Sequence, residues 1–146
     1  MKLFAKILLT IAAIQYGVIP VIVDLTDTHV FHHGWPPHAR FHMVWLLIIG
    51  SSVAAYVLAL LWVVGKDKTE SLRHAAVLGC LPLIGFFASA VLMGRYGGSL
   101  SDLEHPIRVM GLDGNVVSFS VAAVLQITGT ILMWRQTKPG LKETKV

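Results

Sequence analysis

Long apolar runs separated by short polar segments are the dominant pattern of this chain. Four runs contain no charged residue: Ile7–Val23, Met43–Gly65, Ala75–Gly94 and Gly114–Trp134. Each is close to the ~20 apolar residues that a helix needs to cross a bilayer. Backbone groups in lipid must be paired within their own segment, so these runs are expected to be helical. The pattern predicts an all-α integral membrane protein, a bundle of four helices.

The composition agrees with this prediction. Hydrophobic residues make up 55% of the chain and charged residues only 14%, whereas soluble domains carry roughly 25% charged residues. A chain of 146 residues has room for one domain. We therefore expect a single transmembrane domain over residues 1–146, with spans at about 3–23, 43–65, 75–94 and 114–134 and a polar tail at 135–146.

The first run also has a second interpretation, as a cleaved signal peptide preceded by the positive charges of Lys2 and Lys6. No small-residue cleavage site follows it, because the bulky sequence Pro20-Val-Ile-Val stands where cleavage would fall. We therefore treat the first run as a span, from which the Lys6 side chain can extend to the membrane surface.

Positive charges fall unevenly on the two sides of a four-span protein. Nine of the 12 Lys and Arg residues lie at the N-terminus, in the loop between the second and third runs, or after the fourth run: Lys2, Lys6, Lys66, Lys68, Arg73, Arg135, Lys138, Lys142 and Lys145. Positive residues favour the cytoplasmic side, so both termini are expected in the cytoplasm of a cell with this protein in its inner or plasma membrane. The net charge of +4 follows this topology and does not indicate a nucleic-acid partner.

The segment from Asp24 to Trp45 is the most polar part of the predicted non-cytoplasmic side. It holds five of the seven histidines together with Asp24, Asp27 and Arg40. Imidazole titrates near neutral pH, and beside carboxylates it can act as a general acid or base. The same side chains can bind a transition metal. A third interpretation is that they are interfacial polar groups in contact with water and lipid headgroups.

The second helix is predicted to begin near Pro36-Pro37, because proline is well tolerated in the first turn of a helix. His38 and His42 then lie four residues apart on one face. Trp45, Ser52 and Tyr56 continue this stripe toward the membrane interior. We expect His38 and His42 to face the bundle, and the stripe to form either a pocket wall or a helix-packing surface.

Polar residues and prolines within the apolar runs give further expectations. Gln15 and Gln126 lie at similar depth, where an amide usually bonds to a neighbouring helix, and a contact between the two would satisfy both. Pro20 is expected to kink the first helix near its outer end. Cys80, the single cysteine, is expected to be a buried structural thiol. Ser101 could cap a short helix in the second outer loop.

The sequence Thr28-His29, followed by Trp35-Pro-Pro-His-Ala-Arg-Phe-His42, resembles a family of small, uncharacterised four-helix membrane proteins from bacteria and fungi. A more distant resemblance is to the EXPERA superfamily of sterol isomerases and sigma-2-type receptors. That resemblance implies a pocket open to the bilayer, for which Asp24, Asp27, His29 and His42 would be the candidates. Met43–Gly65 lacks the acidic residue that those proteins carry in their second span.

These features favour a membrane protein whose outward-facing pocket binds a small lipophilic molecule or converts it by acid–base chemistry. In this hypothesis, protons are carried by His29, His38 and His42, which Asp24 and Asp27 orient. The predicted ligand-binding residues are Arg40, Trp45, Ser52, Tyr56, Gln15 and Gln126. No cofactor is required. One alternative is a protein that binds copper, zinc, iron or haem, with His29, His38, His42 and Asp27 as metal ligands. The other is a non-catalytic subunit of a homo- or hetero-oligomeric membrane complex.

Overall fold

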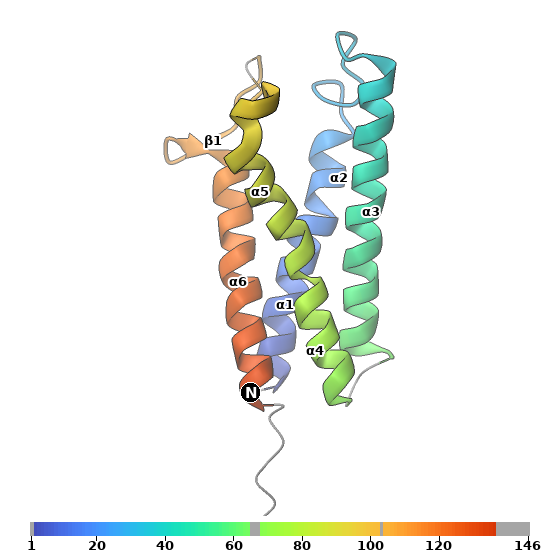
Figure 1. The fold of residues 1–146 in the computed structure, drawn as a ribbon, viewed down its shortest axis with the longest axis vertical. Helices are drawn as coiled ribbons and strands as arrows, with labels where there is room; N and C mark the ends of the chain where they lie inside the picture. Colours follow the sequence, from blue (N-terminus) through green and yellow to red (C-terminus); the bar gives the residue numbers. More distant parts are fainter. Residues whose placement is uncertain (1, 65–67, 103, 137–146) are drawn as a thin grey trace, which may run out of the picture.

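A computed structural model describes residues 2–64, 68–102 and 104–136. Within these residues, four helical segments are long and apolar enough to cross a membrane: Lys2–Asp24, Pro37–Trp62, Thr69–Tyr96 and Gly114–Gln136. The regular secondary structure of the described residues is helical apart from one two-stranded hairpin. Four such segments indicate a membrane protein. Figure 1 shows them running side by side, with the N-terminus and the end of the last helix at the same end of the molecule.

The first segment is divided into α1 (Lys2–Gly17) and α2 (Ile19–Asp24). Pro20 lies in the first turn of α2 and has no N–H for a helical hydrogen bond, which explains the predicted bend at the outer end. The Ser51 hydroxyl donates to the carbonyl of Gly17 at the break, over 2.7 Å. This hydrogen bond joins the end of α1 to the following helix, to which Ser51 belongs.

The second segment is the unbroken helix α3 (Pro37–Trp62), whose N-cap is Pro36. This start confirms the prediction from the two prolines, and it lies before the uncharged run begins. The third segment is divided into α4 (Thr69–Leu78) and α5 (Cys80–Tyr96) at Gly79. Pro82, in the first turn of α5, removes a backbone donor at this break.

The core lies where α1 packs against α3 and α6 (Gly114–Gln136), and where α4 packs between α3 and α6. Close helix approach depends on small residues. A Cβ added at Gly17 would lie 2.2 Å from the Ala54 Cβ, and one at Gly129 would lie 2.9 Å from Leu9 side-chain atoms. Helix α5 instead packs mainly against α6, and Leu83 is the one residue of α5 that is buried. Much of α5 is therefore exposed to whatever surrounds the protein.

Aromatic and cationic side chains pair at the end that carries the N-terminus. The Lys6 ammonium lies over the Trp62 ring, 5.2 Å from its centroid, and the Arg73 guanidinium lies 5.3 Å from that of Trp134. Lys6 is only 8% exposed, because its side chain folds along this aromatic surface.

The loop between α5 and α6 contains a hairpin of β1 (Arg108–Val109) and β2 (Leu112–Asp113). Its turn has positive φ at Met110 and Gly111, the backbone that tight hairpin turns require. The expected short helix capped by Ser101 is wrong. The Ser101 hydroxyl donates to the Asp113 carboxylate, which also accepts the backbone N–H groups of Asn115 and Val116 and so caps α6.

One other expectation has a clear outcome, and one is not tested. The contact between Gln15 and Gln126 is not formed, because the Gln15 amide donates to the carbonyl and hydroxyl of Ser118 at 2.7 and 3.1 Å. The predicted polar tail lies outside the described residues from position 137 onward, and so does the first part of the loop after α3, at 65–67.

Candidate functional site

The loop between α2 and α3 is held by its own short-range hydrogen bonds. The backbone N–H of Val30 donates to the carbonyl of Asp24, and the Thr26 hydroxyl donates to the carbonyl of Val23. Val30 is 3% exposed and anchors the turn beneath the polar residues. The Thr28 hydroxyl and His29 Nδ1 lie 2.9 Å apart. His29 is therefore fixed by its sequence neighbour.

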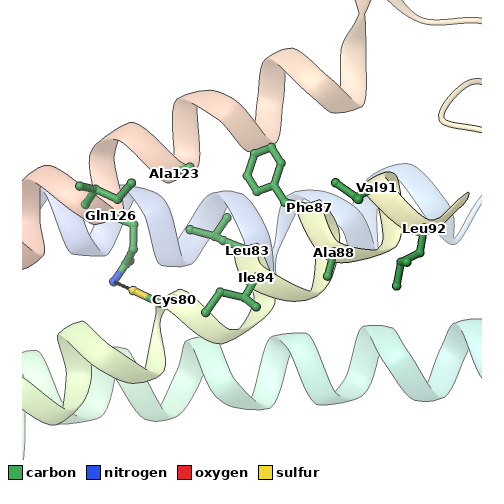
Figure 2. Close-up of a pocket in the computed structure, with 10 residues that line it drawn as sticks. Cys80, Leu83, Ile84, Phe87, Ala88, Val91, Leu92, Ala123 and Gln126 are labelled. Carbon is green, nitrogen blue, oxygen red and sulfur yellow. Dashed lines mark hydrogen bonds between the residues drawn. The ribbon is translucent and has the colours of Figure 1, made fainter.

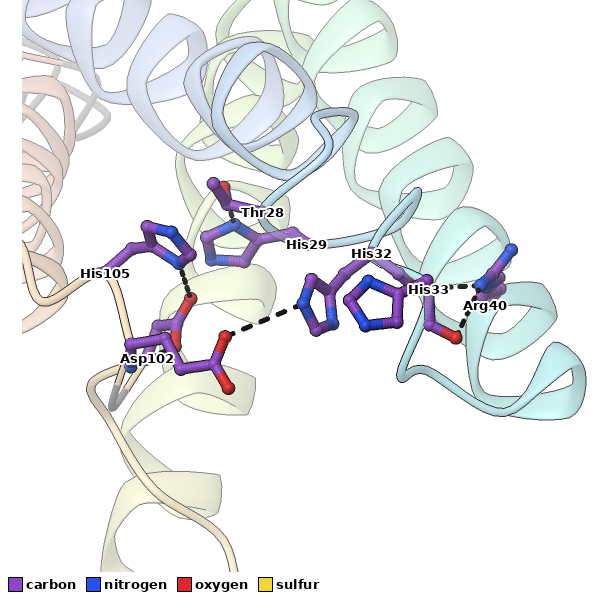
Figure 3. Close-up of polar contacts among 8 residues, drawn as sticks. Thr28, His29, His32, His33, Arg40, Asp102 and His105 are labelled. Atoms are coloured by element: carbon purple, nitrogen blue, oxygen red, sulfur yellow. Dashed lines mark hydrogen bonds and ion pairs between the residues drawn. The ribbon is translucent and has the colours of Figure 1, made fainter.

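Polar side chains connect the loop between α2 and α3 to the loop between α5 and α6 (Figure 3). His32 Nε2 lies 3.6 Å from the Glu104 carboxylate, and His105 Nδ1 lies 3.3 Å from the Asp102 carboxylate. The backbone N–H of Glu104 donates to Asp102, and this bond, together with interactions from His105, lowers the pKa of the Asp102 carboxyl. The histidines of this face thus form pairs that are spread over two loops.

Arg40 has a structural partner in the first loop. Its Nη2 donates to the carbonyl of His32 over 2.7 Å and reaches that of His33 at 3.5 Å. The guanidinium therefore closes the loop onto the first turn of α3. Arg40 lines neither of the two grooves described below, so its predicted role of holding a polar headgroup rests on the sequence alone.

The candidate histidines of the described residues form separate pairs rather than one cluster. Among the residues that the structure describes, no group of three or more His, Cys, Asp and Glu side chains could hold a metal ion. His38 and His42 contact one another, with their Nε2 atoms 3.0 Å apart, while His29 bonds to Thr28. Asp27 is exposed and Asp24 is half-buried at the end of α2. Of the four predicted metal ligands, only His38 and His42 lie in contact with one another.

The face of α3 was also predicted incorrectly. His38 and His42 are exposed, as are Trp45, Ser52 and Tyr56, so the stripe is not buried against the other helices. The side of α3 that packs is marked by the buried residues Leu47, Ala54, Val57, Leu60 and Leu61. Since α3 is apolar on all sides below its first turns, its hydrophobic pattern does not identify the packed face.

A groove with a volume of about 670 Å³ lies between α5 and α6. Its lining residues are Cys80, Leu83, Ile84, Phe87, Ala88, Val91, Leu92, Ala123, Gln126 and Ile127. Figure 2 shows Leu83, Phe87 and Val91 on the side of α5 that faces α6, with Gln126 reaching from α6 toward Cys80 at one end. The groove is almost wholly apolar, so Gln126 supplies its main polar group.

Gln126 is fully buried at the break between α4 and α5. Its Nε2 donates to the carbonyl of Ala76 over 2.7 Å and contacts the Cys80 sulfur at 3.9 Å. A Cβ at Gly79 would lie only 2.7 Å from the amide, so glycine makes room for this side chain. The Gln126 Oε1 atom has no hydrogen-bond partner among the described residues.

A second unpaired polar atom lies nearby in the core. Tyr16 is 4% exposed, and its hydroxyl has no partner in the described residues. The phenol is within electrostatic range of the Cys80 thiol. Cys80 itself is half-buried, and its thiol donates to the carbonyl of Ala76, so it is a structural thiol at the edge of the groove rather than a fully buried one.

A smaller groove of about 400 Å³ lies between α2 and α3, and Ser51 and Ser52 are among its lining residues. Their hydroxyls are already used, because Ser51 donates to Gly17 and Ser52 to the carbonyl of Ile48. This groove has no free polar group comparable to that of Gln126. The predicted ligand residue Ser52 thus lines a groove, but not the one with an unpaired buried atom.

Sequence reasoning identified Gln126 and missed the rest of the α5–α6 groove. An amide within an uncharged run is a visible signal, whereas Leu83, Phe87 and Val91 look like any other residues of an apolar helix. Their common position becomes evident only when the break at Gly79 directs α5 toward α6.

Residues 8–138 of the chain match the sequence model of a protein family that is described as a family of unknown function (DUF6640). No curated protein and no solved structure matches the chain. These comparisons support the resemblance to an uncharacterised family and give no support to the EXPERA resemblance.

Proposed function

The chain belongs to this family of unknown function, and we propose from its structure that it is a membrane protein that binds a small lipophilic molecule in the groove between α5 and α6. The bound molecule would enter from the hydrocarbon of the bilayer, which the exposed residues Ile84, Val91 and Ile127 contact. It would carry one hydrogen-bond donor, such as a hydroxyl group, for the Gln126 Oε1 atom.

The observation that carries this proposal is the unpaired oxygen of Gln126. A buried polar atom without a partner costs about 1–3 kcal/mol, and buried groups of this kind usually have one. Gln126 is fully buried, its Nε2 is bonded to Ala76, and its Oε1 has no partner in the described residues. A donor on a ligand in the adjoining groove would remove this cost, and the groove volume is in the range of small-molecule sites.

The proposed orientation is a bundle of four spans with both termini in the cytoplasm. Its support is the distribution of Lys and Arg, together with the Lys6–Trp62 and Arg73–Trp134 pairs at the end that carries the N-terminus. The outer loops with their histidines would then lie on the non-cytoplasmic side. None of those histidines lines the groove, so binding is favoured here over acid–base conversion.

The test compares two probes that differ in one hydroxyl group. Purified protein in lipid nanodiscs is titrated with hexadecanol or with hexadecane, and bound molecules are counted by native mass spectrometry. We expect the alcohol to bind about tenfold more tightly, which corresponds to about 1.4 kcal/mol for one satisfied acceptor.

Two variants locate the effect. Gln126→Leu should abolish the preference for the alcohol while keeping the apolar binding. Gln15→Leu is the matched control, since it removes an amide that bonds to Ser118 outside the groove, and it should keep the preference. Equal binding of both probes to the unaltered protein would contradict the proposal.

A second candidate function is that of a subunit in a larger membrane assembly. It is favoured by α5, which buries Leu83 and leaves Ile84, Val91 and Leu92 exposed. A partner helix that covers α5 would also cover the groove. Purification in a mild detergent distinguishes the two functions: a stoichiometric protein partner, or a dimer whose interface includes Val91, would favour the assembly.

A further inference from the structure

Two histidines at the start of α3 form a pair that the groove does not use. His38 and His42 are one helical turn apart, both are exposed, and their Nε2 atoms lie 3.0 Å apart. Their ring planes are nearly perpendicular, at 86°, with centroids 4.4 Å apart. The helix start at Pro37 fixes this arrangement, because both side chains leave the same face of an unbroken helix.

The distance between the two nitrogens matches that between neighbouring ligands of one metal ion. Two imidazole nitrogens, each about 2.0–2.1 Å from a metal, lie about 2.9 Å apart at a right angle and about 3.4 Å apart at a tetrahedral angle. The observed 3.0 Å is close to the right-angled value. Square-planar or tetragonal coordination by nitrogen and oxygen is typical of Cu²⁺, which also binds such ligands most strongly in the divalent first-row series.

We propose that His38 and His42 chelate a Cu²⁺ ion at the outer end of α3. Both residues precede the uncharged run Met43–Gly65, so the ion would lie at the level of lipid headgroups and water. No third His, Cys, Asp or Glu ligand adjoins the pair in the described residues, and water would complete the coordination. The Arg40 guanidinium, whose charge would oppose a cation, is bonded to the carbonyls of His32 and His33.

The site has a natural reporter. The Trp45 ring is 5.9 Å from the His42 ring, centroid to centroid, and it is exposed on the same face. A paramagnetic Cu²⁺ ion bound to His42 would quench Trp45 fluorescence. The quenching therefore reports on this pair through a side chain that is not a ligand.

The experiment titrates CuCl₂ into untagged, full-length protein in detergent, with glycine in the buffer to compete for weakly held copper. We expect saturable quenching at one equivalent, and an electron paramagnetic resonance spectrum that shows nitrogen ligands. His38→Ala and His42→Ala should each weaken binding at least tenfold. His29→Ala is the matched control and should bind copper normally, because His29 is paired with Thr28.

Trp45→Phe tests the reporter separately. It should lose most of the quenching and keep the copper spectrum. Copper affinity that is unchanged in the His38→Ala/His42→Ala double variant would overturn the proposal. So would an equal small loss in every single histidine variant, which would mean adventitious copper only. The copper titration does not depend on whether hexadecanol binds at Gln126. The copper proposal and the lipophilic-ligand proposal can therefore fail independently.

Discussion

Gly79 lies at a position where the neighbouring Gln126 side chain leaves no room for a Cβ atom. Its φ and ψ of −64° and −14° are ordinary helical values that alanine adopts freely. Alanine would still not fit, because its Cβ would lie 2.7 Å from both terminal atoms of the Gln126 amide. The residue is thus required by a neighbour from another helix, which the local sequence does not reveal.

Gly79→Ala is therefore expected to destabilise the protein by about 1–3 kcal/mol, the usual cost of overpacking. Unfolding in mixed micelles with increasing SDS measures this. Gly85→Ala in α5 is the control: nothing lies within 4 Å of its added Cβ, so it should be neutral or stabilising by up to about 1 kcal/mol. Adding Gln126→Ala should restore most of the stability lost in Gly79→Ala. A destabilisation that persists in this double variant would assign the cost to the backbone instead.

At the scale of helices, Asp113 has a capping role that can be separated from its charge. Its carboxylate accepts the N–H groups of Asn115 at 2.9 Å and Val116 at 3.3 Å, at the start of α6. Asp113→Ala should cost about 0.5–2 kcal/mol, measured as a fall in the thermal unfolding midpoint. Asp113→Asn keeps an oxygen acceptor and should cost much less. Equal losses in both would show that the charge, rather than the cap, matters.

The same carboxyl gives a prediction about pH. Burial raises the pKa of Asp113, but hydrogen bonds from the Ser101 hydroxyl and the N–H groups of Val116 and Asn115 outweigh it, so the pKa is below its ordinary value. A lowered pKa in the folded state means that stability is present above the unfolded value of about 3.9 and is lost as the pH falls further. Asp113→Asn should remove this part of the acid dependence. An unchanged acid profile in the variant would contradict the prediction.

Helix positions could be predicted from the sequence because lipid requires apolar runs of a given length, and Pro37 and Pro20 marked a start and a break correctly. Helix orientation could not. The outward direction of His42 and Tyr56 depends on which side of an evenly apolar helix meets its neighbours. The groove beside Gln126 depends on the break at Gly79, where glycine is explained by an amide from α6 that is 47 positions away in the chain. Contacts of this kind are a property of the assembled helices.

At the scale of the whole molecule, topology determines which side of the membrane each proposed site faces. The start of α1 and the end of α6 lie at one end, and the histidine-bearing loop lies at the other (Figure 1). Nine of the 12 Lys and Arg residues lie within positions 2–6, 66–73 and 135–145, so that end is expected in the cytoplasm. The copper pair would then meet the outer solution.

Labelling of single cysteines tests this orientation directly. Cys80 is the single cysteine of the chain, and Cys80→Ser keeps a hydroxyl that can still bond to the carbonyl of Ala76, so the background should fold. Gly34→Cys in this background should react with a membrane-impermeant maleimide on intact cells, because Gly34 lies in the exposed outer loop. Lys138→Cys should react only after the membrane is opened. The Cys80→Ser parent controls for labelling of other groups. If both cysteines reacted from the same side, an even number of membrane crossings would lie between them instead of the expected three, and the four-span orientation would have to be abandoned.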